Sequence, residues 1–132
     1  MSSVLLLGRI LFSLIFIFSG LNHIFNLKAM TQYAASMGVP AAAVLVPLSG
    51  LWILVGGAFV LLGYKAKLGG WMLFIFLILA ALFMHRFWGV DDPMMAQNQM
   101  IHFMKNMSMA GAALMITYFG SGPHSLEKGE GE

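Results

Sequence analysis

The stretch "AAAVLVPLSGLWILVGGAFVLLG", residues 41–63, contains no charged residue. A helix needs about 20 mostly apolar residues to cross the roughly 30 Å hydrocarbon core of a bilayer. This segment meets that requirement, and we predict that it spans a membrane. We expect Pro47 to kink the helix, because proline removes one of its backbone hydrogen bonds.

Three further segments with a similar composition flank this one. Together they predict an all-α membrane protein: four transmembrane helices in an up-down bundle with short loops. The bundle forms a single domain over residues 1–120, with a flexible cytoplasmic tail over 121–132. The four predicted spans cover about residues 4–25, 41–63, 68–88 and 98–120.

The overall composition supports a membrane location. Of 132 residues, 60% are hydrophobic and only 9% are charged, and the mean hydropathy is +0.86. A soluble domain of this size needs more charge on its surface. The net charge of +2 is too small to indicate a nucleic-acid partner. The chain has no cysteine, which excludes disulfides, thiol catalysis and iron–sulfur clusters.

The basic residues of the short loops predict the orientation. Such residues stay preferentially on the cytoplasmic side of the membrane. Lys65 and Lys67 lie between the second and third spans, and Asp91 and Asp92 lie in the next loop. We therefore expect both termini in the cytoplasm.

Ionisable side chains are concentrated in "MHRFWGVDDPMMAQNQMIHFMKNMSMAG", residues 84–111. The up-down topology brings the far end of the first span to the same membrane face. Intramembrane ionisable groups usually point into a bundle, so we predict a polar pocket near the outer leaflet. Its candidate residues are Arg9, His23, His85, Arg86, Gln99, His102, Lys105 and Asn106. Arg9 lies nearer the cytoplasmic face and is equally compatible with an interfacial anchor.

Lys105 and Asn106 receive the most specific prediction. Consecutive side chains diverge by about 100° around a helix. We expect Asn106 to lie on the inward stripe with His102 and to bond a neighbouring helix. Lys105 then lies at the edge of that stripe, with its ammonium directed toward Asp91, Asp92 or a loop carbonyl. The alternative is a lysine that extends into the headgroups on the lipid side.

Small residues recur at helical spacing and predict close helix packing. The predicted packing positions are Gly20, Ser49, Gly56, Gly57 and Gly111. A bundle with such small-residue faces is also compatible with a homo-oligomer.

Three ligand types are alternatives for the polar segment. Its methionines and histidines are ligands that suit Cu(I), and a zinc site at His23, His85 and His102 is a comparable alternative. Neither has a compact ligand motif, so we expect no intrinsic metal or cofactor. A quinone or lipid ligand fits better. Its head group needs hydrogen-bond donors, and its tail needs an apolar slot near Trp88 and Phe103.

The segments "GRILFSLIFIFSGLNHIF", "MGVP", "LVGGAFVLLG", "HFMKNMSMAGAALM" and "GSGPHSL" resemble the DoxX family of small four-helix bacterial membrane proteins. The resemblance covers nearly the entire chain. Carried over by position, it points to Arg9, Gly20, Gly57, Lys105, Asn106 and Gly111. One departure is Ile53, where many relatives carry a glutamate, so this chain lacks that carboxylate.

The resemblance also implies a location in the bacterial inner membrane, and a function. The family is named from its association with a terminal quinol oxidase, and a related branch includes subunits of thiosulfate:quinone oxidoreductase. We therefore expect an accessory subunit of quinone-linked or respiratory redox chemistry. Its expected partners are membrane lipids and a redox membrane complex. The alternative is a structural scaffold or assembly factor without ligand or catalysis. A transporter or channel is less favoured, because the second and third spans carry no charge at mid-depth. No residue is assigned a catalytic role.

Overall fold

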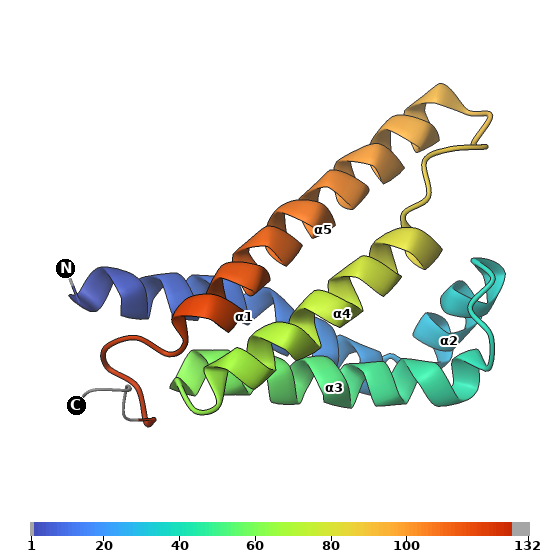
Figure 1. Cartoon of the computed structure of the whole chain (residues 1–132). Helices are drawn as coiled ribbons and strands as arrows, with labels where there is room; N and C mark the ends of the chain where they lie inside the picture. Colours follow the sequence, from blue (N-terminus) through green and yellow to red (C-terminus); the bar gives the residue numbers. More distant parts are fainter. Residues whose placement is uncertain (1, 128–132) are drawn as a thin grey trace.

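The computed structural model describes residues 2–127. Within this range all of the regular secondary structure is α-helical, and there are no strands. The five helices are α1 (Ser2–Phe25), α2 (Leu27–Ser36), α3 (Ala42–Leu62), α4 (Ala66–Met84) and α5 (Pro93–Phe119) (Figure 1).

Three of these helices are long and apolar enough to cross a membrane, and they cover Ser3–Phe25, Ala42–Leu62 and Ala66–Met84. Large apolar side chains such as Leu11 and Phe18 point outward and are more than 60% exposed. Lipid would cover such surfaces in a bilayer. This is a transmembrane protein, and the prediction of four spans is confirmed for three. Helix α5 has 27 residues and is long enough, but its polar residues keep it outside this group.

The helices are arranged as two pairs. Helix α1 lies along α3, α5 lies along α4, and the pairs join through α3 and α4. Helices α1 and α5 have no more than marginal contact. Figure 1 shows the α4–α5 pair diverging from the α1–α3 pair. The expected up-down bundle is therefore open on the side between α1 and α5.

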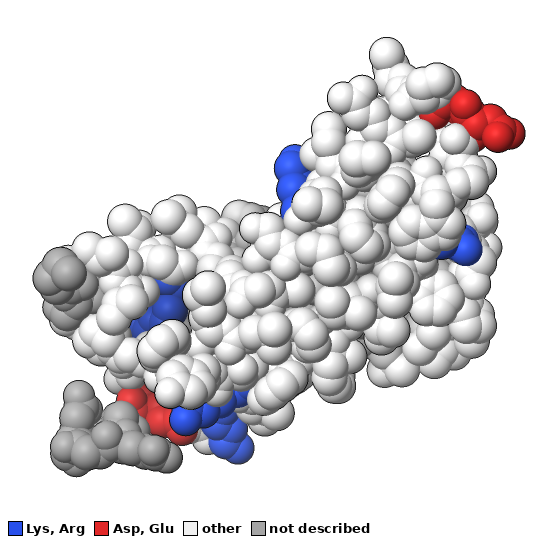
Figure 2. Space-filling model, turned by 45° about the horizontal axis from the view of Figure 1, so that its top comes forward, with Lys and Arg blue, Asp and Glu red and all other residues white. Residues whose placement is uncertain are grey.

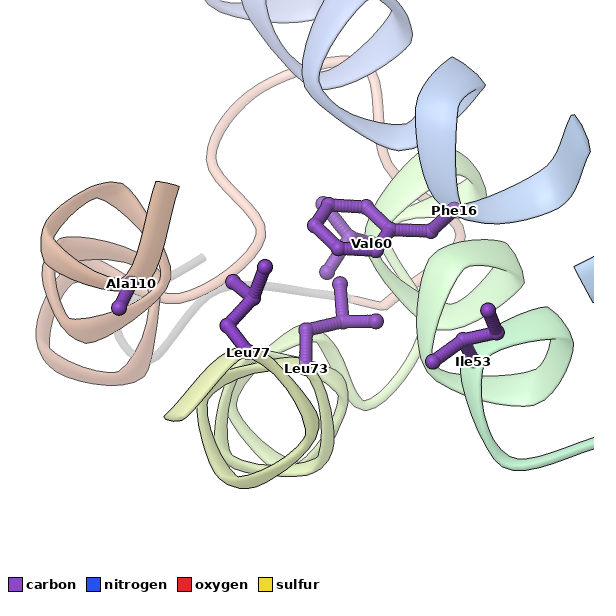
Figure 3. Packing of buried hydrophobic residues seen from close by; sticks show 6 residues of the cluster. All are labelled: Phe16, Ile53, Val60, Leu73, Leu77 and Ala110. Atoms are coloured by element: carbon purple, nitrogen blue, oxygen red, sulfur yellow. The ribbon is translucent and has the colours of Figure 1, made fainter. Parts of the chain in front are cut away.

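A small hydrophobic core holds the pairs together. It consists of Phe16 from α1, Ile53 and Val60 from α3, Leu73 and Leu77 from α4, and Ala110 from α5. Figure 3 shows Phe16, Val60, Leu73 and Leu77 gathered between the helices, with Ala110 to one side on α5. All six are no more than 3% exposed. Because Leu73 and Leu77 belong to the central helix, they join the two pairs.

Glycines let the helices approach closely. A Cβ added to Gly20 would lie 2.8 Å from the carbonyl oxygen of Gly50, so α1 and α3 cross there almost backbone to backbone. Gly57 also faces α1, whereas Gly56 faces Leu73 of α4. The adjacent glycines of α3 thus serve two neighbouring helices.

Two residues that were predicted as packing positions, Gly111 and Ser49, have other surroundings in the structure. A Cβ added to Gly111 would have no neighbouring atom within 4 Å, because α5 packs along α4 alone and Gly111 faces away from it. Ser49 donates its hydroxyl hydrogen to the carbonyl oxygen of Val46 over 2.8 Å, and its side chain lines a cavity.

Helix boundaries differ from the predicted ones around the polar loop. Helix α4 ends at Met84 rather than at residue 88, and α5 begins at Pro93 rather than at residue 98. Asp92 is the N-cap of α5, and its carboxylate accepts a hydrogen bond from the amide of Met94 over 3.1 Å. Proline is favoured at the first helical position that follows such a cap. Helix α2 was not predicted as a separate helix.

The start of the C-terminal tail, residues 121–127, is docked on the end of α3. The amides of Leu126 and Glu127 donate to the carbonyls of Leu62 and Gly63 over 3.0 and 2.9 Å. These carbonyls lie at the C-terminus of α3, where the helix leaves acceptors without partners. The expectation of a flexible tail did not include this docking, and residues 128–132 lie outside the described part of the chain.

Candidate functional site: the cavity between the helix pairs

A cavity of about 800 Å³ lies between the two helix pairs. Ligand sites in proteins typically measure about 300–1,000 Å³. All five helices line this cavity, each with apolar side chains such as Phe16, Met30, Trp52, Leu79 and Met109. No aspartate or glutamate is among the lining residues. The cavity is therefore an apolar space, and its polar groups are confined to a few positions.

The first polar group is a pair of histidines at one end of the cavity. His85 follows the last residue of α4, and His102 lies on α5. Their ring centroids are 5.1 Å apart. The Nδ1 atom of His85 donates to the side-chain oxygen of Gln99 over 3.1 Å. The structure thus brings together His85, Gln99 and His102, all three from the predicted set.

The environment of His85 changes its acidity. Burial lowers the pKa of His85 below its ordinary value of 6.5, since the imidazolium form loses solvation. The hydrogen bond that His85 donates to Gln99 raises the pKa, and the nearby His102 lowers it further. His85 is therefore held toward its neutral form, in which one ring nitrogen remains an acceptor.

Asn106 and Lys105 occupy different environments, although they are consecutive. Asn106 is buried, and its side-chain nitrogen donates to the carbonyl oxygen of Leu77 on α4 over 3.3 Å. It therefore bonds a neighbouring helix, as its place on the inward stripe predicted. Lys105 is exposed and lies at the edge of the cavity.

The prediction that the ammonium of Lys105 pairs with Asp91, Asp92 or a loop carbonyl is wrong. Within residues 2–127, its ammonium has no hydrogen bond or ion pair with an acidic residue or a carbonyl. Asp92 caps the first turn of α5, about 20 Å along the helix from Lys105, which is beyond the reach of a lysine side chain. The positive charge at the edge of the cavity is thus available to a ligand.

His23 reaches the cavity from α1 but does not join the histidine pair. It is buried, its Nδ1 donates to the carbonyl oxygen of Ser19 over 2.6 Å, and its ring meets the edge of Phe76. Among the described residues, no group of three or more histidines and carboxylates is placed to hold a metal ion. The zinc alternative at His23, His85 and His102 therefore lacks the necessary geometry.

Comparisons with known proteins place the chain in a family. The family model for DoxX matches residues 4–86. The chain belongs to the DoxX family. It is 32% identical to the "Inner membrane protein YphA" of Escherichia coli (strain K12) over 126 residues, which is 95% of this chain and 89% of that protein. No solved structure matches the chain.

Membership in the DoxX family makes the environment of Ile53 informative. From the resemblance to DoxX proteins, we expected many relatives to carry a glutamate at this position. Here Ile53 is fully buried and packs in the same core as Phe16 and Leu73. The position is therefore a packing position in this DoxX protein, without a free polar group.

Three predicted residues do not line the cavity: Gln99, Arg86 and Arg9. Gln99 bonds His85, which does line it. Arg86 donates to the carbonyl oxygen of Met37 over 2.8 Å and so links the α4–α5 loop to the end of α2. Both residues line a second, smaller cavity of about 330 Å³. Arg9 is not among the lining residues of the large cavity; it lies under the docked tail, where Nη2 donates to the carbonyl oxygen of Pro123 over 3.2 Å.

Some residues that line the large cavity were not predicted from the sequence. Met30, Tyr33 and Ala34 of α2 line the cavity. Their spacing of three and four positions is the signal of a helix face, and it could have been found. Trp52 also lines the cavity, with its indole nitrogen donating to the carbonyl oxygen of Met72 over 2.7 Å. Its charge-free surroundings gave no indication of a site.

Proposed function

We propose that this DoxX protein binds an amphipathic, quinone-sized ligand in the large cavity and serves as an accessory subunit of quinone-linked or respiratory redox chemistry. The observation that carries the proposal is a largely apolar cavity of about 800 Å³ whose lining includes the polar side chains of His85, His102 and Lys105. A quinone needs donors for its carbonyl oxygens and an apolar space for its tail. The family's association with quinol-linked enzymes supports the same ligand class.

The chain's own residues would hold such a ligand as follows. The ammonium of Lys105 and the ring of His102 supply donors at the cavity edge, and neither is buried. Ile15 and Leu79 also line the cavity and are half-exposed. In a bilayer these two side chains would contact lipid, so a ligand dissolved in the membrane would enter sideways between the helix pairs. The redox centre belongs to the ligand or a partner complex.

We further propose that α5 is the fourth span, that both termini lie in the cytoplasm, and that the protein is in the bacterial inner membrane. Twenty-seven residues of helix extend about 40 Å, and α5 runs along the spanning helix α4. Lys65 in the α3–α4 turn and Lys67 at the start of α4 favour a cytoplasmic position for that turn. The name of the Escherichia coli relative supports the inner membrane.

Single-cysteine labelling tests this topology without interference, since the chain has no cysteine. The three variants are Tyr64→Cys, Asp91→Cys and Ser121→Cys, each probed in intact cells with a membrane-impermeant thiol reagent. We expect labelling at position 91 alone. Labelling at both 91 and 121 would show that α5 does not cross the membrane.

The functional proposal is tested by purifying the tagged protein from native membranes under mild conditions. We expect a bound quinone in the lipid extract and redox-complex subunits among the co-purified proteins. The matched control is a variant with a filled cavity, Ala80→Phe, which should lose the quinone. Recovery of neither a quinone nor a redox partner would contradict the proposal and favour the scaffold alternative.

A further inference from the structure

Arg9 is a buried cation that has no anionic partner within residues 2–127. It is 6% exposed, and Nη2 donates to the carbonyl oxygens of Pro123 and His124 in the docked tail. Its Nε and Nη1 atoms are buried without a hydrogen-bond partner. Among residues 2–127 no carboxylate forms an ion pair with it. The charge therefore rests on two neutral carbonyl groups, although a buried guanidinium is strongly favoured beside an anion.

A second unsatisfied group lies one turn along the same helix face. The hydroxyl of Ser13 is fully buried and has no hydrogen-bond partner. Buried polar groups are normally paired, so an unpaired one needs an explanation. Arg9 and Ser13 together leave three buried polar atoms that act as donors. Several donors around a positive charge are the arrangement that binds an oxyanion such as phosphate.

The surroundings of Arg9 are basic. Lys65 lies in the turn between α3 and α4, and Lys67 lies in the first turn of α4. Gly63 of the α3–α4 turn lies against the Arg9 guanidinium, and the stem of Lys67 lies against Gly120. The acidic Glu127 uses its carboxylate to accept from the main-chain amide of Lys65 over 2.8 Å. Figure 2 shows Lys and Arg side chains gathered beside an acidic group at this end of the molecule.

This basic cluster lies where lipid phosphates are found. Helix α3 ends at Leu62 and α4 begins at Ala66, so the turn between these two spanning helices marks one membrane surface. Basic pockets between spanning helices at a membrane surface are a known means of binding anionic headgroups. The source of an oxyanion for Arg9 is therefore the surrounding bilayer.

The described part of the tail, residues 121–127, covers Arg9 and is held by main-chain hydrogen bonds to the end of α3. Leu126 and Glu127 donate to the end of α3, and the segment between them and α5 is rich in glycine and serine. Leu126 is 71% exposed and adds little buried apolar surface. The cover is thus far less extensively packed than the helices beneath it.

We propose that Arg9 is the centre of a binding site for the phosphate of an anionic phospholipid, and that the headgroup enters by displacing residues 121–127. The phosphate then replaces the carbonyls of Pro123 and His124 and pairs with the Arg9 donors that are free in the structure. Lys65 and Lys67 add to the attraction. This site is separate from the large cavity and does not depend on the quinone proposal.

Native mass spectrometry of the full-length protein tests the site, with phosphatidylglycerol compared with phosphatidylethanolamine. We expect preferential retention of phosphatidylglycerol, reduced about tenfold or more in Arg9→Gln because a charge-assisted contact is lost. The matched control is Arg86→Gln, which removes an arginine at the other end of the spans. Glu127→Gln should raise retention, because it weakens the cover.

Hydrogen exchange of the unsubstituted protein in nanodiscs keeps the test independent of how Arg9→Gln folds. The amides of Leu126 and Glu127 should exchange faster when phosphatidylglycerol is added to phosphatidylcholine. Equal exchange in the two lipid mixtures, or equal retention of the two lipids, would overturn the proposal. The same increase with inorganic phosphate alone would assign the site to free phosphate and overturn the lipid assignment.

Discussion

Asn106 of α5 and Leu77 of α4 are joined by a hydrogen bond of 3.3 Å between the side-chain nitrogen and the main-chain oxygen. The bond lies beside the core, where Leu77 is 1% exposed. It fixes the rotation of α5, so that His102, one turn earlier, faces His85 and Lys105 reaches the cavity edge. A polar contact between two packed helices thus positions the candidate site.

Removing this contact should destabilise the pairing of α4 and α5. For Asn106→Ala we expect a loss of about 1 kcal/mol in the free energy of unfolding, the size of an interhelical hydrogen bond in a membrane protein. Unfolding in mixed micelles with increasing denaturing detergent measures it. Asn98→Ala is the matched control, since Asn98 lies exposed on the same helix. Equal losses of unfolding free energy in the two variants would contradict a structural role for the Asn106 hydrogen bond.

Two glycine substitutions should have opposite consequences. A Cβ at Gly20 would lie 2.6 Å from Cγ of Leu54 and 2.8 Å from the carbonyl oxygen of Gly50, so Gly20→Ala should cost about 1–3 kcal/mol of stability through overpacking. Gly111→Ala meets no atom within 4 Å. It should leave stability unchanged or raise it slightly, because alanine favours helix formation. Thermal unfolding of both variants checks this. A large loss from Gly111→Ala would reveal a contact that a single chain does not make.

The stability of the protein should depend on pH through His85. Its pKa is lowered in the folded state, so the folded protein binds fewer protons here than the unfolded chain. The contribution of His85 to stability is then present above pH 6.5 and declines as the pH falls below that value. NMR titration of the histidine ring protons should find His85 titrating below 6.5.

The same titration in His102→Gln provides a control. The nearby His102 lowers the pKa of His85, so its removal should shift the titration of His85 upward. A titration of His85 at or above 6.5 in the unsubstituted protein would contradict the burial that the structure gives it.

Lys105 should matter for ligand binding and not for folding. Its ammonium has no partner among residues 2–127, so Lys105→Met should change the free energy of unfolding by no more than about 0.5 kcal/mol. Quinone retention should fall because a donor at the cavity edge is lost. Thermal unfolding and quinone quantification on the same preparation separate the two effects. A large loss of stability with unchanged quinone content would instead support the scaffold alternative.

The spans could be read from the sequence because the bilayer imposes a length and an apolar composition. The charge-free stretch 41–63 became helix α3 (Ala42–Leu62) with almost the same bounds. Helix α2 was not predicted, because its ten residues have mixed polarity and resemble a loop between strongly apolar segments. Its role in lining the cavity follows from tertiary packing.

The side-chain partners were harder to predict, for two physical reasons. Lys105 was paired with Asp91 or Asp92 because all three were placed near one surface, but α5 begins at Pro93 and separates them along its axis. The partners of Arg9 are the main-chain carbonyls of Pro123 and His124. Any residue supplies a carbonyl, so no side-chain pattern marks such a contact. The stripe with His102 and Asn106 was predictable, because helical spacing fixes which side chains share a face.

Tryptophan fluorescence offers a direct view of the cavity. Trp52 lines it, whereas Trp71 and Trp88 do not, and these three are the tryptophans of the chain. The double variant Trp71→Phe, Trp88→Phe therefore leaves one fluorophore in the proposed site. A quinone bound in the cavity would quench it by contact.

Quinone titration of this single-tryptophan protein in nanodiscs is the measurement that tests ligand binding most directly. We predict saturable quenching of Trp52, which is lost when Ala80→Phe fills the cavity and weakened by Lys105→Met. Quenching that rises linearly with the quinone content of the bilayer and is the same in all three proteins would contradict a binding site in this cavity.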